Sequence, residues 1–377
     1  MIDRLNIIVL GACNSGKSSL INLIAGQKVS LVADHAGTTT DPVRKVMEMP
    51  VLGPVMLVDT AGFDDSGVLG EERVSLTEKA LEASDIAILL VGENPPAESH
   101  WLKILEERKI PVVKVVNKTD TGRDVPAGCI VVSAIKGEGR SAILEALSRA
   151  LPADFGEPDL LRGLVKAGDN VVLVMPQDPQ APKGRLILPQ VQTIRALLDK
   201  GCNAVCTTPD RLPGTLRALS SIPDLVITDS QVFRQVKDSL PEECRLTSFS
   251  VLMAAFKGDI DYFAESAAAI SNLKDGDRIL IAEACTHAPQ TEDIGRVKIP
   301  ALLRKKTGAN LEIDIVSGKD FPDDLTPYAL VIHCGGCMFN RRLVLSRVSR
   351  ARAQHIPMTN YGITLAHLSG LLPSIIW

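Results

Sequence analysis

Residues 11–18 of this sequence form a pattern that could bind the phosphates of a nucleotide. They read Gly-Ala-Cys-Asn-Ser-Gly-Lys-Ser and fit the P-loop pattern G-x-x-x-x-G-K-S/T. A strand-like run, Leu5–Leu10, precedes them and a helical stretch follows. The glycines let backbone amides turn toward the phosphates, and the helix N-terminus adds a favourable dipole. We expect Lys17 to reach the β- and γ-phosphates and Ser18 to bind Mg²⁺.

Two further segments predict a guanine nucleotide as the ligand. Residues 59–62 read Asp-Thr-Ala-Gly after a strand-like run, so Asp59 can hold Mg²⁺ through water and the Gly62 amide can contact the γ-phosphate. Residues 117–120 read Asn-Lys-Thr-Asp. The Asp120 carboxylate can accept two hydrogen bonds that guanine donates and adenine cannot.

Other residues of this half bear on hydrolysis. Asn14 resembles the asparagine of GTPases that use K⁺ as a catalytic cation, and residues 37–41 resemble a switch I segment in which we favour Thr39 as the Mg²⁺-closing threonine. Phe63 stands where Ras-like proteins carry a water-orienting glutamine, which predicts slow hydrolysis. The expected GTP, Mg²⁺ and K⁺ residues are Gly11, Asn14, Ser15, Gly16, Lys17, Ser18, Ser19, Thr39, Asp59, Gly62, Asn117, Lys118, Asp120, Ser133 and Ala134, with Lys17, Asn14 and Thr39 acting in catalysis.

A second group of residues has metal-ligand spacing. Cys285 and His287 are followed, after residues 288–332, by the segment 333–337, which reads His-Cys-Gly-Gly-Cys. Cys-x-x-Cys places two thiolates, Cys334 and Cys337, on one turn, and Cys285 would supply a third. Three soft thiolates suit an iron–sulfur cluster, and tetrahedral zinc held by three cysteines and a histidine is the alternative. A redox dithiol is a further alternative, although the surrounding pattern is not thioredoxin-like.

Three cysteines leave one iron of a four-iron cluster in need of another ligand. Candidates within reach are His287, His333 and the acidic pair Glu292 and Asp293. A histidine beside a cysteine can instead donate a hydrogen bond to the site without touching the metal.

The elements that would position these residues read as an α/β protein. Short apolar runs alternate with amphipathic helical stretches, which is typical of parallel sheets covered on both faces. The predicted strands are Leu5–Leu10, Val55–Val58, Ile86–Val91, Val112–Val116, Cys129–Val132, Asn170–Met175, Asn203–Thr207, Asp224–Thr228, Arg245–Phe249, Arg278–Glu283, Leu311–Val316 and Ala329–Ile332. If the strands before Cys285 and His333 are neighbours, both residues lie at the same sheet edge.

We predict three domains. Residues 1–157 hold the P-loop motifs and a mainly parallel sheet, and a Pro-Gly-containing segment ends them. Residues 158–256 form an α/β stretch without a cluster of catalytic residue types, which favours a structural or oligomerisation role, with a substrate site as the alternative. Residues 257–377 carry the cysteines.

Composition excludes several classes of protein. The 377 residues carry 41 Lys and Arg against 45 Asp and Glu, a net charge of −4, and only 3% aromatic residues. Both values argue against a nucleic-acid binder. No apolar run is long enough to span a membrane, and the early strand Leu5–Leu10 leaves no room for a signal peptide. We therefore expect a cytoplasmic protein that binds neither nucleic acid nor membrane.

A basic run follows the Cys-x-x-Cys turn. Arg341, Arg342, Arg347, Arg350 and Arg352 lie on a predicted helix whose apolar stripe is Leu343, Val344 and Val348. The basic face would be solvated, or it would dock an acidic partner or an anionic cluster precursor.

The motifs together resemble a known family. Those of residues 1–150 are similar to translation-factor-like GTPases, and the C-x-H…H-C-x-x-C motif formed by Cys285, His287, His333, Cys334 and Cys337 is similar to that of the [FeFe]-hydrogenase maturation GTPases, called HydF. This resemblance implies a homodimeric three-domain α/β protein with a GTPase domain, a dimerisation domain and a domain that binds a [4Fe-4S] cluster.

The resemblance also implies a function. Such a scaffold hydrolyses GTP, receives a transient di-iron precursor made with two radical-SAM enzymes, and delivers it to apo-[FeFe]-hydrogenase. A regulatory GTPase with a structural zinc site is the first alternative. An RNA-modification GTPase is the second, because that group shares the Asn14-type P-loop.

Overall fold

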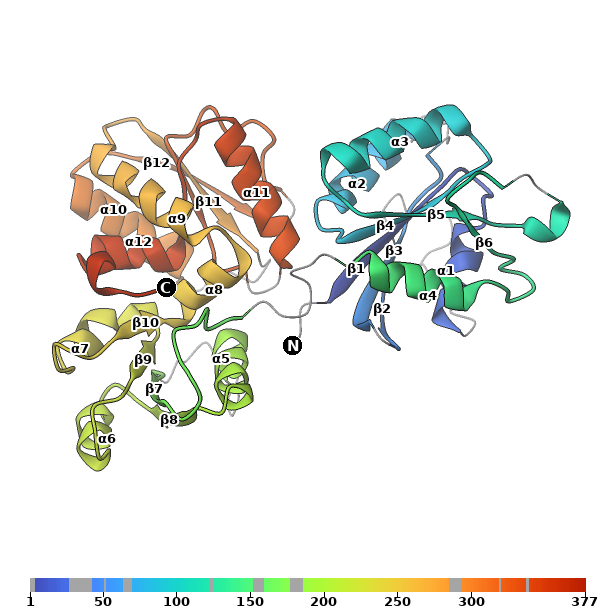
Figure 1. Cartoon of the computed structure of the whole chain (residues 1–377). Helices are drawn as coiled ribbons and strands as arrows, with labels where there is room; N and C mark the ends of the chain where they lie inside the picture. The colour runs from blue at the N-terminus through green and yellow to red at the C-terminus, as the bar shows by residue number, and fades with distance from the viewer. Residues whose placement is uncertain are drawn as a thin grey trace. The chain divides into compact units, whose positions relative to one another are not determined.

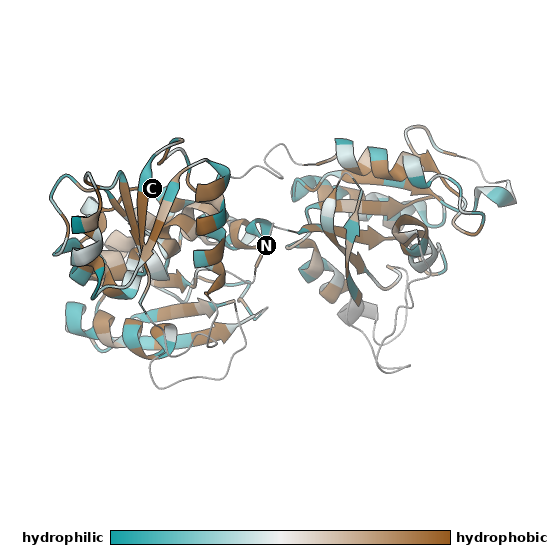
Figure 2. Cartoon of the chain, turned by 90° about the horizontal axis from the view of Figure 1, so that it is seen from below, coloured by the Kyte–Doolittle hydropathy of each residue, from teal (hydrophilic) through white to brown (hydrophobic). Residues whose placement is uncertain are grey.

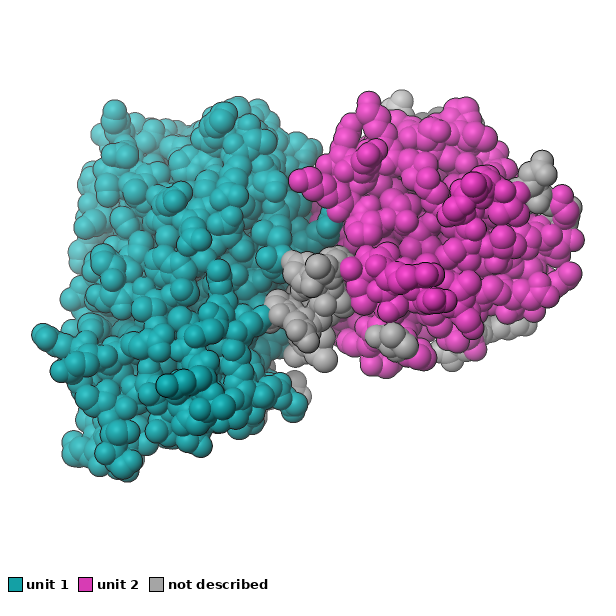
Figure 3. Space-filling view, in the orientation of Figure 1, with its two compact units in different colours: residues 1, 158–377 teal, residues 2–157 magenta. Residues whose placement is uncertain are grey.

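The structure is a computed structural model of the chain. It describes residues 4–26, 43–50, 52–63, 70–122, 125–151, 159–176, 186–284, 293–318, 320–336 and 339–377. The chain divides into two compact units, residues 2–157 and residues 158–377 with residue 1 (Figure 3). In both units the strands are the most apolar segments, and helices with polar outer faces cover them (Figure 2).

The first unit is built on a six-stranded sheet with the order β2-β3-β1-β4-β5-β6 (Figure 1). All its neighbouring strands are parallel except the pair β2 and β3. Its elements are β1 (Leu5–Leu10), α1 (Lys17–Ala25), β2 (Val43–Met49), β3 (Gly53–Asp59), α2 (Gly70–Leu81), β4 (Ile86–Leu90), α3 (Pro95–Glu107), β5 (Val112–Val116), β6 (Ile130–Val131) and α4 (Arg140–Arg149).

The second unit contains two four-stranded parallel sheets. The first has the order β10-β9-β7-β8, and the second has the order β12-β11-β13-β14. The elements of the first are β7 (Asn170–Val174), α5 (Leu188–Asp199), β8 (Asn203–Thr207), α6 (Leu212–Ala218), β9 (Leu225–Thr228), α7 (Phe233–Lys237), β10 (Leu246–Ser248) and α8 (Phe249–Lys257). Those of the second are α9 (Ile260–Ser266), β11 (Arg278–Glu283), α10 (Ile299–Thr307), β12 (Glu312–Ser317), β13 (Leu330–His333), α11 (Arg341–Ala353), β14 (Met358–Asn360) and α12 (Tyr361–Leu368).

The predicted α/β class and strand positions are confirmed, and the differences have local causes. The edge strand β2 was not predicted because it alternates half-buried and exposed residues instead of forming an apolar run. The short strand β14 was missed because its sequence, Met-Thr-Asn, contains two polar residues that are nevertheless buried. The chain continues from the end of α9 at Ser266 as a 3₁₀-helix over Ala267–Asn272.

Two helices of the second unit begin directly at the end of a strand. Ser248 ends β10, and its side chain accepts a hydrogen bond from the Val251 amide at the start of α8. Asn360 ends β14 and caps α12 in the same way, through the Ile363 amide. These caps satisfy helix N–H groups that would otherwise have no acceptor. Because the second turn is so tight, Tyr361 is held next to the carboxyl end of β14.

The two sheets of the second unit share one hydrophobic core. Phe263 of α9 is 1% exposed and belongs to a buried cluster that includes Val172 and Val226 from one sheet and Leu280 and Val331 from the other. The two sheets therefore depend on the same buried surface.

We predict that Phe263→Ala destabilises both sheets of the second unit in a single transition. Removing a buried Phe side chain costs about 3–5 kcal/mol. Calorimetry of the full chain should show one transition moved to lower temperature and one unchanged. Leu105→Ala, in the core of the first unit, is the matched control and should move the other transition. Separate melting of the two sheets would contradict the shared core.

Candidate functional site

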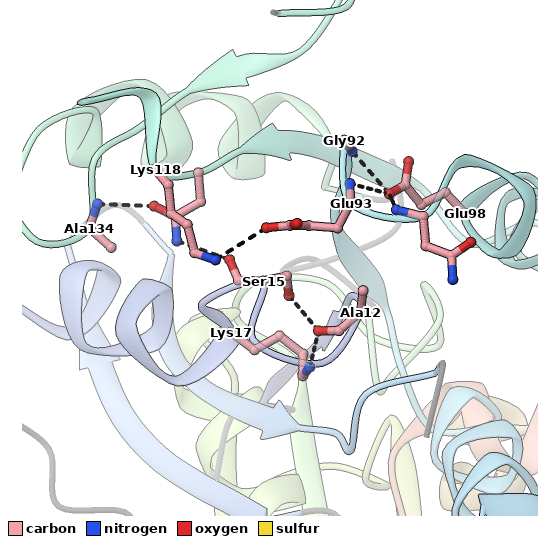
Figure 4. Close-up of polar contacts among 10 residues, drawn as sticks. Ala12, Ser15, Lys17, Gly92, Glu93, Glu98, Lys118 and Ala134 are labelled. Carbon is pink, nitrogen blue, oxygen red and sulfur yellow. Dashed lines mark hydrogen bonds and ion pairs between the residues drawn. The ribbon is translucent and has the colours of Figure 1, made fainter. Parts of the chain in front are cut away.

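The loop after β1 is folded around the side chain of Lys17. Its Nζ donates to the carbonyl oxygens of Gly11 and Ala12 at 3.0 and 2.9 Å, and the Ser15 hydroxyl donates to Ala12 at 2.8 Å (Figure 4). Lys17 is only 9% exposed. A phosphate group that enters the loop would replace these carbonyls as the partner of the ammonium group.

Position 16 requires glycine because of its backbone conformation and because of the atoms that surround it. Its φ of 92° lies in the left-handed region, and a Cβ there would collide with the Asn117 side-chain nitrogen. Asn14 also has a positive φ, of 58°, which asparagine tolerates better than most residues. Gly11 is buried, and Ser19 lies exposed on α1.

Ser18 and Asp59 meet beside the loop and fit a Mg²⁺ ion. The Ser18 hydroxyl donates to Asp59 Oδ2 at 2.8 Å, and Asp59 Oδ1 is buried without a hydrogen-bond partner among the residues the structure describes. Burial raises the pKa of Asp59, although Ser18 and Lys17 act in the opposite direction. An unsatisfied buried carboxylate oxygen beside a hydroxyl is the donor set that a hard cation prefers.

Asn117, at the end of β5, ties the phosphate loop to the base-binding segments. Its amide nitrogen donates to the Ser15 carbonyl at 3.2 Å, and its oxygen accepts from the Ala134 amide at 3.1 Å (Figure 4). Asp120 accepts a hydrogen bond from the Ser133 hydroxyl at 2.8 Å, and this bond is the main reason that the pKa of Asp120 is lowered. Asp120 is exposed and remains ionised, as recognition of guanine requires.

Two acidic residues of this region were missed in the sequence. Glu98, 6% exposed, accepts hydrogen bonds from the amides of residues 92–94 at 2.8–3.0 Å, and so fixes the loop after β4. That loop places Glu93 3.2 Å from Lys118 Nζ (Figure 4). The signal for Glu98 is its place in the first turn of α3, after the capping Asn94 and two prolines.

The predicted residues of the GTP site thus gather at the carboxyl ends of β1, β3, β5 and β6. Gly62 packs so closely on Cys13 that a Cβ would collide with its sulfur. Thr39 lies outside the described residues.

The second group of candidate residues lies at the carboxyl edge of the sheet β12-β11-β13-β14. Strands β11 and β13 are neighbours, which is the condition under which residues that follow them share one sheet edge, and Ala282 pairs with His333. The Cys334 sulfur accepts hydrogen bonds from the amides of Ala284 at 3.0 Å and Gly336 at 3.4 Å. Two amide donors stabilise a thiolate, which is the form that binds iron or zinc.

Both ring nitrogens of His333 form hydrogen bonds with other groups of the protein. It is 1% exposed, its Nδ1 donates to the Cys334 carbonyl at 2.7 Å, and its Nε2 accepts from Arg347 at 2.9 Å. Burial, and secondarily Arg347, lower the pKa of His333 to about 3, so the ring is neutral. This arrangement favours the alternative in which His333 orients the cysteine turn over the one in which it binds the metal.

The prediction that the arginines of α11 form one basic, accessible face is wrong for Arg347. This residue is 2% exposed, its guanidinium lies 4.6 Å from the ring centres of both Phe321 and Phe339, and it donates to the Gly318 carbonyl at 2.6 Å. Cation–π contacts on both sides compensate the loss of water. A buried arginine on a helix that also buries Val344 and Val348 extends the inward face instead of opposing it.

A buried lysine holds the same turn from another helix. Lys257, at the end of α8, is 3% exposed and donates to the carbonyl oxygens of Gly336 and Phe339. Gly336 has a φ of 61°, which glycine adopts without strain. Two buried cations therefore flank the segment that carries Cys334.

Three more polar residues lie at this edge. Glu283, 4% exposed, accepts from the Arg296 guanidinium at 2.8 and 3.2 Å and from the Ser317 hydroxyl at 3.3 Å. Asp293 accepts from the Arg296 amide at 2.9 Å. The Tyr361 hydroxyl is buried and has no hydrogen-bond partner within the described part of the chain. Burial first, and then the charges of Cys334 and Glu283, raise the pKa of Tyr361.

These features fit a thiolate-held metal group. Cys285, His287, Glu292 and Cys337 lie outside the described residues, and no group of three or more His, Cys, Asp or Glu side chains that could hold a metal occurs within the described ranges. The donor set that is described, a sulfur stabilised by two amides beside an unsatisfied hydroxyl, is compatible with a soft metal centre. Among the described residues, no helix is both long enough and apolar enough to cross a membrane.

Three family models match the chain in succession. A model described as 50S ribosome-binding GTPase matches residues 6–118, one for the Hydrogen maturase F dimerization domain matches residues 160–258, and one for the Hydrogen maturase F tetramerization domain matches residues 261–376. The first match identifies a GTPase domain, for which GTP and Mg²⁺ are the ligands.

Curated relatives of the chain are tRNA modification GTPases. The tRNA modification GTPase MnmE of Parvibaculum lavamentivorans is 34% identical over 155 residues, which cover 41% of this chain and 34% of that protein. MnmE of Acidiphilium cryptum is 31% identical over 227 residues, covering 57% and 47%. The chain spans about a third to a half of the length of these relatives.

Solved structures give weaker likenesses. A variant of Aquifex aeolicus Era bound to GDP.AlF4- has a TM-score of 0.35 and 20% identity, covering 58% of this chain and 99% of that chain. The G domain of FeoB from T. maritima has a TM-score of 0.31 and 23% identity, covering 39% and 98%.

We predict that Asp59→Asn stabilises the nucleotide-free protein and weakens its binding of GTP with Mg²⁺. The amide of Asn carries no charge, and the raised pKa of Asp59 means that burial disfavours the charged carboxylate, so the free energy of unfolding should rise at neutral pH. Mg²⁺-dependent GTP affinity should fall tenfold or more, or about 1.4 kcal/mol. Thermal melting and fluorescent-nucleotide titration measure the two effects.

The pH dependence of this stabilisation has a definite sign. Because the pKa of Asp59 is raised above its ordinary value of 3.8, the folded wild type takes up a proton before the unfolded chain does as the pH falls. The wild type therefore gains stability toward acid, and the advantage of the variant should shrink as the pH approaches 3.8. An advantage that grows toward acid would contradict the assignment.

Proposed function

The chain belongs to the HydF family of hydrogenase maturation GTPases, and on this basis we propose that it is a scaffold and carrier for assembly of the [FeFe]-hydrogenase di-iron active site. The observation that carries the proposal is the succession of three family models over residues 6–376, with the complete five-residue motif that includes Cys334 in the last of them. The boundaries 1–157, 158–256 and 257–377 remain our proposed domain division.

In the GTPase domain, we propose a role for each residue that the contacts described above support. Lys17 and the amides of the loop bind the phosphates, Ser18 and Asp59 hold Mg²⁺, and Asp120 selects guanine. Phe63 stacks on Trp101 with ring centres 6.3 Å apart, and its side chain has no group that can orient water. We propose that K⁺ held by Asn14 neutralises the negative charge that develops in the transition state. Thr39 would close over Mg²⁺.

In the C-terminal domain, Cys285, Cys334 and Cys337 would hold a [4Fe-4S] cluster. When bound, such a cluster supplies an iron with an exchangeable fourth position at which a cargo can be accepted or released. Within the protein, two amides donate to the Cys334 sulfur, and His333 and Arg347 fix the turn. His287 and Glu292 remain candidates for the fourth position.

The cargo and partners follow from the family. The di-iron precursor would come from two radical-SAM enzymes and pass to apo-[FeFe]-hydrogenase, with a homodimer as the working assembly. The family models name both dimerization and tetramerization, so self-association is supported by two separate domains. A cytoplasmic location completes the proposal.

The favoured rival is a regulatory GTPase with structural zinc, because three cysteines suit both metals. The MnmE relatives are also GTPases, but the matched segments span less than half of each of those proteins. This similarity therefore gives no support to a tRNA modification activity in this chain.

We predict about four irons and four sulfides per chain after anaerobic reconstitution, because three cysteines and one exchangeable ligand suit a cubane cluster. Metal analysis, sulfide analysis and EPR after reduction measure this. Cys334→Ser should abolish the cluster, whereas Cys206→Ser, at an exposed cysteine of β8, should leave it intact. Stoichiometric zinc without sulfide would refute the cluster and support the rival.

We also predict that K⁺ accelerates GTP hydrolysis tenfold or more relative to Na⁺, because a well-placed cation stabilises the transition state. A tenfold acceleration corresponds to a decrease of about 1.4 kcal/mol in the activation free energy. Asn14→Ala should reduce the K⁺ to Na⁺ ratio toward one without preventing nucleotide binding. Asn272→Ala, at an exposed asparagine of the other unit, should keep the wild-type ratio. Equal wild-type rates in the two salts would show that the K⁺ assignment is wrong.

A further inference from the structure

The pairing of three strands brings Tyr361, Cys334 and Glu283 to the same edge of the sheet. His333 of β13 pairs with Asn360 of β14 and with Ala282 of β11, in both cases in parallel register. Cys334 directly follows β13, Tyr361 directly follows β14, and Glu283 is the last residue of β11. Because the carboxyl ends of parallel strands meet at one edge, all three residues lie there.

The Tyr361 hydroxyl is an unsatisfied group at this edge. It is buried, and nothing in the described part of the chain forms a hydrogen bond with it. The other two tyrosines differ, because Tyr262 donates to the Ile356 carbonyl at 2.7 Å and Tyr328 donates to Asp314 at 3.1 Å. A buried hydroxyl without a partner costs stability, so its presence needs a reason.

Two acidic residues of this edge are hydrogen-bonded to Arg296. Glu283 Oε2 accepts from Arg296 and Ser317, and the Arg296 amide donates to Asp293. The segment beside the hydroxyl, Ile294–Lys298, is a π-helix, a form of turn that is frequent at functional sites.

Gly295, in this π-helix, leaves room for the hydroxyl. A Cβ at this position would collide with the Tyr361 oxygen and would lie 3.0 Å from Glu283 Oε1. The lack of a side chain here therefore leaves space for the phenol oxygen between the π-helix and Glu283. The charge of Cys334 also acts on this hydroxyl, which has no hydrogen-bond partner among the described residues.

We propose that the Tyr361 hydroxyl donates a hydrogen bond to a sulfur atom of the iron–sulfur group bound at Cys334, and so helps to retain that group and sets its reduction potential. The inference rests on the proposed function, because it requires the cluster. Hydrogen bonds to cluster sulfurs stabilise the more negative, reduced state and raise the potential. No proton leaves the tyrosine, and no bond other than this hydrogen bond is formed.

Tyr361→Phe removes the hydroxyl alone, and Tyr262→Phe is the matched control. In the metal-free chain, Tyr361→Phe should melt at the wild-type temperature or above it, because no hydrogen bond is lost, while Tyr262→Phe should melt lower. After reconstitution, Tyr361→Phe should hold the same iron and sulfide as the wild type. Its midpoint potential should be more negative, its EPR g-values shifted, and its loss of iron to a chelator severalfold faster.

The outcomes separate this inference from the proposed function. A wild-type protein that takes up zinc and no sulfide overturns both. A wild-type protein with a cluster, together with a Tyr361→Phe variant of unchanged potential and iron-loss rate, overturns only the role of Tyr361. Metal-free Tyr361→Phe that melts as low as Tyr262→Phe also overturns it, since the hydroxyl would then have a structural partner.

Discussion

Parallel pairing of neighbouring strands is the constraint on which both sites depend. In a parallel sheet all carboxyl ends lie at one edge, so residues that directly follow different strands meet there even when they are far apart in sequence. In the first unit this brings together the loop after β1, Asp59 and Asn117. In the second unit it aligns Glu283, Cys334 and Tyr361. The chemistry of both units is therefore set by where strands end and by which strands are neighbours.

The cysteine turn depends further on two buried cations. Burial of a charge is costly unless hydrogen bonds replace water, and here backbone carbonyls and aromatic rings do so for Lys257 and Arg347. Lys257 lies within the matched dimerization domain, whereas the turn lies within the matched tetramerization domain. A single ammonium group thus links the end of α8 to the segment that carries Cys334. A shift of α8 would therefore move this turn through the hydrogen bonds that Lys257 donates to it.

The sequence predicted the parts of the molecule that local patterns determine. Apolar runs located most strands, and fixed spacing located the P-loop and the cysteine motif, because these signals lie within a few residues. The burial of Arg347 could not be predicted, since its partners His333, Phe321 and Gly318 come from other elements. Tyr361 was overlooked for the same reason: an isolated tyrosine has no spacing signal, and its position follows from the pairing of β13 with β14.

The two sites share one energetic property. Each keeps a buried polar atom without a hydrogen-bond partner among the described residues, Asp59 Oδ1 in one unit and the Tyr361 hydroxyl in the other. Either atom lowers the stability of the empty protein, by about 1–3 kcal/mol for a typical unsatisfied group. Each lies beside a group that suits a ligand, the Ser18 hydroxyl or the Cys334 edge. Because a bound group can satisfy the atom, part of the binding free energy is the recovery of a cost already present in the folded chain.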